Sequence, residues 1–208
     1  MPHVTFPAHH VFWTHIDKHN EIKSKYMSKI KNMETADHGY MCNMKSNIKN
    51  RTNFLDADVY DALVWEPVAK MIEESGGELF LGDSFIQSYW YNVYDQGDFQ
   101  EKHEHSAYPI EINGQLYHPS LSMIYILNDE NDSASTVFVD ANPVPFGPSL
   151  KFKSFDTSHV EDIKEGTVII FSPRLHHIVK PIKVGGRITI AFNIFSTFSR
   201  TEGKPECA

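Results

Sequence analysis

Three histidines and one arginine stand where they could support metal and carboxylate chemistry. His103 and His105 are one residue apart and follow a strand-like run. On an extended strand both imidazoles would project from the same face, because side chains alternate with a period of two. A third histidine from a distant strand, His177, could complete a facial three-ligand metal site that leaves coordination positions open.

An anchor for a carboxylate is predicted ten residues after His177 in the sequence. Arg187 follows Gly185-Gly186 and opens an apolar run to Phe192. Its guanidinium is a rigid fork that suits a carboxylate. Thr189 shares its face on a strand, so the guanidinium and the hydroxyl could bind the same oxyanion. A surface charge on an edge strand is the alternative for Arg187, and the apolar character of the run argues against it.

Short strands must position these residues. From residue 78 onward the chain consists of short runs rich in aromatic and β-branched residues, separated by Gly, Asn, Asp and Pro. The runs are 79–81, 85–86, 89–94, 123–127, 136–139, 167–171 and 187–193. Many short strands with turns between them indicate a sandwich or jelly roll. An Asn113-Gly114 hairpin is expected around His118, which is a further possible ligand.

The first part of the chain shows patterns of both helices and a strand. A short strand is predicted at 11–13 and a helix at 16–30. A second helix begins at Asp56, with Asp56 or Asp58 as N-cap, and Pro67 kinks it or starts its next segment. We therefore expect one mainly β (α+β) domain over 1–208. Residues 1–77 would be a helical support region packed on one face of a core that spans 78–200.

Bulk composition narrows the functional classes. The 208 residues are 41% hydrophobic, enough for a sizeable core, and carry a net charge of -8. That acidic balance disfavours a nucleic-acid partner. No apolar run reaches the length of a membrane span, and the first residues do not resemble a signal peptide. With only Cys42 and Cys207, both expected to be free thiols, a reducing cytoplasmic location is the expectation.

Four motifs in order resemble the iron(II)- and 2-oxoglutarate-dependent dioxygenase superfamily, in its prolyl hydroxylase-like branch. The resemblance covers about residues 85–195. The motifs are Trp90-x-Asn92-Val93 leading to His103-x-His105, Leu121-Ser122-x-x-Tyr125-Ile126-Leu127-Asn128, Gly166-Thr167-x-x-x-Phe171-x-Pro173-x-x-x-His177, and Arg187-Ile188-Thr189-Ile190-x-Phe192-Asn193.

This resemblance implies a double-stranded β-helix and a complete site. Fe(II) would bind His103, His105 and His177, and 2-oxoglutarate and O2 would take the open positions. The far carboxylate of 2-oxoglutarate would lie against Arg187 and Thr189, with Tyr125 as a further donor and Asn92 nearby. The implied reaction couples decarboxylation to succinate with hydroxylation of a peptide or small molecule.

One position departs from the family pattern. The superfamily usually carries Asp or Glu where this sequence has His105, so either three histidines hold the metal or a carboxylate from elsewhere replaces one. Two other functions therefore stay open: a cupin-like three-histidine dioxygenase that uses no keto acid, and a β-sandwich binding module without catalysis. The Arg187-x-Thr189 pair argues against the cupin-like alternative, in which that pair would have no purpose. A nucleic-acid demethylase is a weaker variant, disfavoured by the acidic charge.

Overall fold

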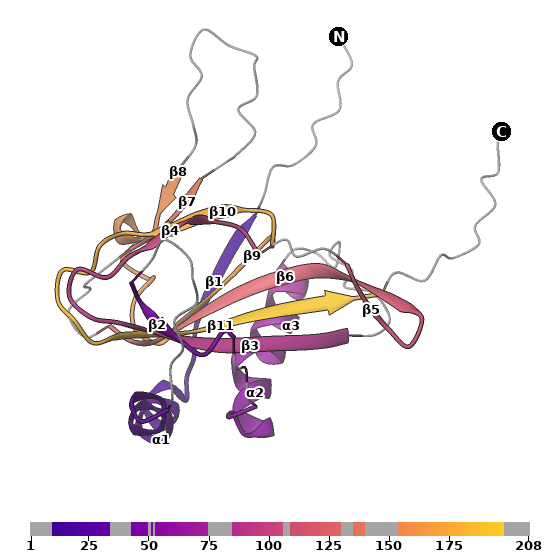
Figure 1. Cartoon of the computed structure of the whole chain (residues 1–208), viewed down its shortest axis with the longest axis horizontal. Coiled ribbons are helices and arrows are strands. Elements are labelled where there is room, and N and C mark those ends of the chain that lie inside the picture. Colours follow the sequence, from indigo (N-terminus) through magenta and orange to yellow (C-terminus); the bar gives the residue numbers. More distant parts are fainter. Residues whose placement is uncertain are drawn as a thin grey trace, which may run out of the picture.

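Two antiparallel sheets form the core of the computed structural model (Figure 1). The structure describes residues 10–33, 43–49, 51, 53–74, 85–105, 109–129, 135–139 and 154–197. The larger sheet has the order β1 (Val11–His15), β9 (Thr167–Phe171), β6 (Gln115–Asn128), β11 (Arg187–Ser196), β3 (Phe85–Tyr94) and β2 (Lys45–Ser46), and β5 (Ile110–Ile112) pairs with β6. The smaller sheet has the order β4 (Gln100–His103), β10 (His176–Val179), β7 (Thr136–Val139) and β8 (Ser154–Asp156). The predicted mainly β, jelly-roll class is confirmed.

Strand β11 shows how the sequence sorts its residues between the two faces of the larger sheet. It lies between β6 and β3, and all of its residues are buried. Ile188, Ile190 and Phe192 belong to the hydrophobic cluster on the helical side. Arg187 and Thr189 alternate with them and line a pocket between the sheets. The period of two in the sequence therefore separates core from site.

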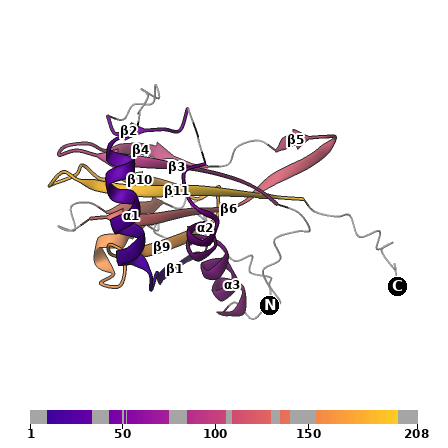
Figure 2. The same cartoon turned by 90° about the horizontal axis from the view of Figure 1, so that it is seen from below.

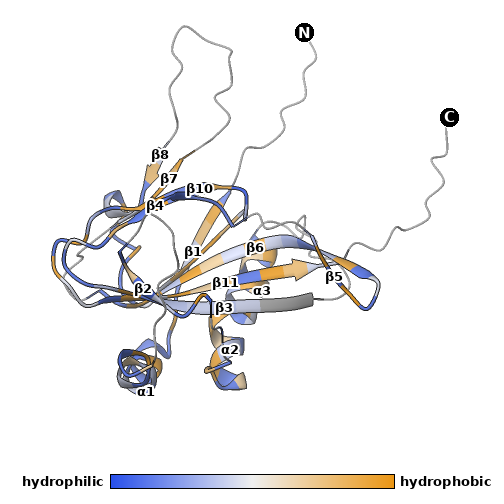
Figure 3. Ribbon diagram, viewed as in Figure 1, coloured by the Kyte–Doolittle hydropathy of each residue, from blue (hydrophilic) through white to orange (hydrophobic). Residues whose placement is uncertain are grey.

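Three helices cover the outer face of the larger sheet (Figure 2). They are α1 (His19–Lys31), α2 (Ala57–Leu63) and α3 (Trp65–Glu74). Helix α1 is mostly hydrophilic (Figure 3), and its buried Ile22, Tyr26 and Ile30 join the cluster under the sheet. Each such side chain stabilises the fold by about 1.5–3 kcal/mol when fully buried. Pro67 lies in the first turn of α3, where its missing N–H costs no helical hydrogen bond.

The N-terminal part of the chain is more than a helical support. Strand β1 pairs with β9 in the register Val11↔Phe171, and β2 pairs with β3, so both extend the larger sheet. The predicted strand at 79–81 lies outside the described residues. In the part of the chain that the structure describes, no helix is both long and apolar enough to cross a membrane.

The expected Asn-Gly hairpin joins β5 to β6. Asn113 and Gly114 both have positive φ, 52° and 79°, at the turn. Two consecutive residues with positive φ are typical of the tight turn that fits the twist of a β-hairpin. Ile112 pairs with Gln115 across it. The arms of this hairpin project beyond the rest of the sheet (Figure 1).

Candidate metal centre

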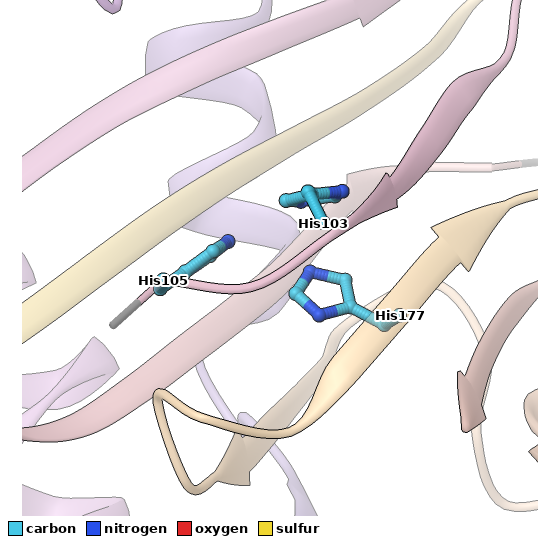
Figure 4. Close-up of side chains that lie close together, drawn as sticks. All are labelled: His103, His105 and His177. Atoms are coloured by element: carbon cyan, nitrogen blue, oxygen red, sulfur yellow. The ribbon is translucent and has the colours of Figure 1, made fainter. Parts of the chain in front are cut away.

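The three predicted histidines lie together between the sheets. One nitrogen from each of His103, His105 and His177 lies within 4.8 Å of the other two (Figure 4). His103 and His177 are direct cross-strand partners on β4 and β10, so their rings share a face. His105 follows the end of β4, where its backbone N–H donates to the carbonyl of Pro173 at 2.8 Å. Two strands and one backbone hydrogen bond thus bring the set together.

Each ring is oriented by a hydrogen bond at Nδ1. Nδ1 of His103 lies 2.7 Å from the carbonyl oxygen of Glu101, and that of His177 lies 3.1 Å from the carbonyl oxygen of Leu175. Because a carbonyl only accepts, each Nδ1 must carry the proton. That tautomer leaves the Nε2 lone pair of each ring available to a metal.

The third ring is held by a polar pair that sequence reasoning missed. His105 Nδ1 lies 3.0 Å from Oδ1 of Asn193, and the same oxygen accepts a hydrogen bond from the Ser122 hydroxyl at 2.8 Å. Asn193 and Ser122 are cross-strand partners on β11 and β6. Asn193 is an even number of residues after Arg187 and polar within an apolar strand, and this pattern is the signal that could have found it.

All three imidazoles are kept neutral by their surroundings. Burial lowers the pKa of His105 to about 3, and the nearby His103 ring adds to this effect. Burial also lowers the pKa of His103 and puts the pKa of His177 well below its ordinary value. Neutral imidazole is the form that binds metal, so the site needs no deprotonation step at neutral pH.

The donor set fits a divalent transition metal. In the described part of the chain, Nε2 of His103 is buried and has no hydrogen-bond partner. Leaving a buried nitrogen without a partner costs free energy, which a bound cation would recover. Three imidazoles on one face, with a pocket beside them, suit zinc, copper, iron or nickel and leave positions for further ligands.

The predicted carboxylate anchor shares this pocket. Arg187, Thr189 and Asn92 line it together with the three histidines. Thr189 and Asn92 are cross-strand partners, and the Asn92 amide donates to the Thr189 hydroxyl at 3.4 Å. Trp90 also lines the pocket, and its ring centroid is 5.5 Å from that of His105. The structure therefore brings these predicted residues into one cavity.

The Arg187 guanidinium also contacts a carboxylate of its own chain. Its Nη1 donates to Oδ2 of Asp129 at 2.5 Å, and the two side chains are only 2% and 5% exposed. Asp129 directly follows β6, a position with no recognisable motif. The sequence around Asp129 therefore gives no sign of this contact.

Other candidate residues lie apart from the cluster. Tyr125 points to the helical face, where its hydroxyl lies 2.7 Å from Nδ1 of His19. It therefore lies on the side of the sheet opposite the predicted carboxylate contact, since residues 124 and 126 face the other way. Glu104 lies 3.9 Å from Nε2 of His176, away from the three rings, as alternation predicts. His118 lies on the hairpin arm of β6 opposite Ser196.

Known proteins resemble this chain in fold but not in sequence. No family model matches the sequence, and no curated protein matches it either. Among solved structures, HygX from Streptomyces hygroscopicus with nickel, 2-oxoglutarate and hygromycin B bound superposes with a TM-score of 0.57 at 10% identity, over 90% of this chain and 82% of that one. A Pseudomonas putida prolyl-4-hydroxylase gives 0.56 at 14% identity, over 91% and 93% of the two chains.

A third similar structure has the same fold. The viral collagen prolyl hydroxylase of Paramecium Bursaria Chlorella virus-1, in its 2-oxoglutarate complex, gives a TM-score of 0.52 at 15% identity, over 89% of this chain and 96% of that one. The predicted resemblance is thus confirmed at the level of architecture: this chain has the double-stranded β-helix fold of the 2-oxoglutarate- and iron(II)-dependent oxygenases, prolyl hydroxylases among them.

Proposed function

We propose that this protein is an iron(II)- and 2-oxoglutarate-dependent dioxygenase that hydroxylates a C–H bond of a peptide or small molecule. One observation carries the proposal. Three histidines with available Nε2 atoms share a single pocket with Arg187 and Thr189, on a fold that oxygenases of this class use. A metal-binding set and a carboxylate-binding set in one cavity match a ligand that chelates a metal through one end and carries a carboxylate at the other.

The histidines would hold the metal, with His103, His105 and His177 each contributing Nε2. Bound iron(II) would supply the chelation of the keto acid and the activation of dioxygen. The protein holds the three rings in one tautomer through Glu101, Leu175 and Asn193. Because these partners are fixed before any ligand arrives, little reorganisation is needed on binding.

The other residues of the pocket would bind and enclose the co-substrate. Arg187 and Thr189 would receive the far carboxylate, since both are buried and face the cavity. Asn92 would support Thr189 through its amide. Exclusion of water from this buried end strengthens each polar contact that forms there.

The similar structures suggest two classes of prime substrate. Among the similar structures are prolyl hydroxylases and a protein with hygromycin B bound. A peptidyl side chain and a small molecule are therefore both candidates for this chain.

A cupin-like dioxygenase that uses three histidines and no keto acid is the second candidate. It is favoured by the contact between Arg187 and Asp129, because that contact gives the arginine a partner without any co-substrate. Binding of 2-oxoglutarate separates the two functions. The keto-acid enzyme needs Arg187 for binding, and the cupin-like enzyme does not bind the keto acid at all.

Succinate formation tests the proposal. Anaerobic protein is loaded with iron(II) and 2-oxoglutarate, oxygen is admitted, and succinate is measured for wild type, His177→Ala and Arg187→Ala. His176→Ala is the matched control, because the neighbouring ring faces Glu104 instead of the cluster. We expect succinate from wild type and the control and none from the other two.

Binding of 2-oxoglutarate is measured in parallel, since turnover without the prime substrate is slow in an uncoupled enzyme. Iron-loaded wild type that binds no 2-oxoglutarate would refute the keto-acid mechanism and favour the cupin-like one.

A further inference from the structure

The predicted carboxylate anchor, Arg187, already has a carboxylate counterion within the protein. Arg187 and Asp129 form an ion pair whose side chains are almost completely buried. Two hydrogen bonds hold the chain at and beside this ion pair. The Asp129 N–H donates to Glu165 at 2.8 Å, and the Asn128 side chain donates to the carbonyl of Gly186 at 2.5 Å. The Asn128–Gly186 hydrogen bond joins the residues that precede Asp129 and Arg187, so the positions of the two charged residues are fixed relative to each other.

Arg187 and Asp129 differ in whether they line the pocket. Arg187 lines the pocket, whereas Asp129, within the described part of the chain, does not. The carboxylate therefore contacts a guanidinium that lines the pocket without lining the pocket itself. A ligand carboxylate in the pocket would meet Arg187 beside Thr189 and Asn92, in a field that Asp129 reduces.

The charges around the pocket explain why such a counterion is useful. Three neutral histidines would leave a divalent metal with its full charge, since the donor set found among the described residues contains no carboxylate. A doubly charged keto acid balances that metal on its own. An uncompensated Arg187 would add one buried positive charge, and Asp129 removes it.

We propose that Asp129 is a positioning residue that sets how strongly Arg187 attracts a second carboxylate, and thereby the preference of this site for a dicarboxylate over a monocarboxylate 2-oxo acid. This inference rests on the proposed function. It makes Asp129 a determinant of co-substrate selectivity that acts only through Arg187.

The test compares two keto acids that differ at the far end. Dissociation constants of 2-oxoglutarate and 2-oxobutyrate are measured by calorimetry on anaerobic, iron(II)-loaded wild type and Asp129→Asn. In the variant, Arg187 has lost the negative charge of Asp129. The far carboxylate of 2-oxoglutarate then becomes its counterion and is attracted more strongly. We expect the preference for 2-oxoglutarate to rise by about tenfold or more, with 2-oxobutyrate binding unchanged.

Asp156→Asn is the matched control, because Asp156 also pairs with a cation, Lys180, but lies on β8 away from the pocket. Its selectivity should equal that of wild type. Asp129→Glu keeps the negative charge and should keep the wild-type preference as well. A purely structural role for Asp129 would weaken both acids together in the Asn variant, and that result would overturn the inference.

Thermal unfolding keeps the test valid if Asp129→Asn is only marginally stable. Since a ligand stabilises the state that binds it, 2-oxoglutarate should raise the Tm of this variant more than that of wild type, and 2-oxobutyrate should raise both equally. Equal shifts with both acids would overturn the inference alone. Failure of wild type to bind either acid would instead overturn the proposed function, and the inference with it.

Discussion

Histidines lie on opposite faces of the larger sheet, His19 on the helical side and the three-histidine cluster on the pocket side, and their hydrogen bonds differ. On the helical side, His19 uses both ring nitrogens: Nδ1 meets the Tyr125 hydroxyl at 2.7 Å and Nε2 meets Glu165 at 3.1 Å. On the pocket side, His103 and His177 are hydrogen-bonded within the described part of the chain at Nδ1, each to a backbone carbonyl. His19 and His177 are both buried, so burial does not distinguish a structural histidine from a metal ligand.

The number of ring nitrogens that are hydrogen-bonded distinguishes His19 from the histidines of the pocket. A histidine with both nitrogens bonded has completed its capacity and contributes to stability. One with a single bonded nitrogen keeps an oriented lone pair and contributes to binding. We therefore expect substitutions on the two faces to separate metal affinity from folding free energy.

Replacement of His177 by Ala should have the largest effect on metal binding. It removes one of three ligands, and we expect the affinity for iron(II) or nickel to fall by more than about 100-fold, beyond the cost of losing an orienting partner. Competition titration with a chromophoric chelator measures the affinity. The matched His176→Ala variant should bind as wild type does. Equal losses in both variants would mean that the cluster is not the metal site.

Asn193→Ala tests the support beneath His105. The alanine removes the acceptor that fixes the ring and its tautomer, so metal affinity should fall by roughly 10–100-fold. Ser122→Ala, which removes only the donor to Asn193, should have a smaller effect in the same titration. An unchanged affinity for Asn193→Ala would show that His105 needs no such support.

His19→Ala should reverse the pattern. It leaves the completely buried Tyr125 hydroxyl without its partner and removes one contact of Glu165, at a cost of about 1–3 kcal/mol in the free energy of unfolding. Chemical denaturation measures this loss, and metal affinity should be unchanged. A fall in metal affinity at constant stability would contradict the separation of the two faces.

Glu165→Gln should give the smallest effect, one that depends on pH. Burial by itself would raise the pKa of Glu165, but the Lys23 ammonium, the Asp129 N–H and His19 outweigh it and hold the pKa below its usual value. A carboxyl with a lowered pKa in the folded state stabilises the fold above its unfolded pKa, and this contribution is lost as the pH falls. Wild type should thus exceed the variant by about 1 kcal/mol or less at pH 7, because the group is partly exposed.

The difference should begin to shrink as the pH falls past the unfolded pKa of Glu, about 4.3, and should vanish only below the lowered pKa of the folded state. Denaturation curves of both proteins across this range check it, with Asp156→Asn as the control for a second paired carboxylate. A difference that stays constant with pH would exclude ionisation of Glu165 as its cause.

From the sequence one could predict the strands and the side chains that follow a strict period, but not the contacts made across the fold. His103, Arg187 and Thr189 could be placed because alternation along a strand fixes their faces. His105 instead lies beyond the end of β4 and is positioned by the hydrogen bond from its N–H to Pro173. The same alternation could have excluded Tyr125, because it faces opposite to residues 124 and 126. Asp129 could not be found, because its contact with Arg187 depends on where two strand ends meet in space. The joining of β1 to β9 is likewise a long-range pairing without a local signal.

The place of β11 in the sheet bears on how the protein is made. This strand is the last in chain order of the described strands, yet it lies between β6 and β3 and supplies Arg187, Thr189 and Asn193. On the ribosome, the two neighbouring strands emerge first and must wait with unpaired edges until β11 is synthesised. The sheet therefore cannot be completed before β11 is made, and folding should be slow, as expected for a topology dominated by distant pairings. The nascent chain would meanwhile be exposed to edge-to-edge aggregation, so expression at low temperature or with chaperones should raise its yield.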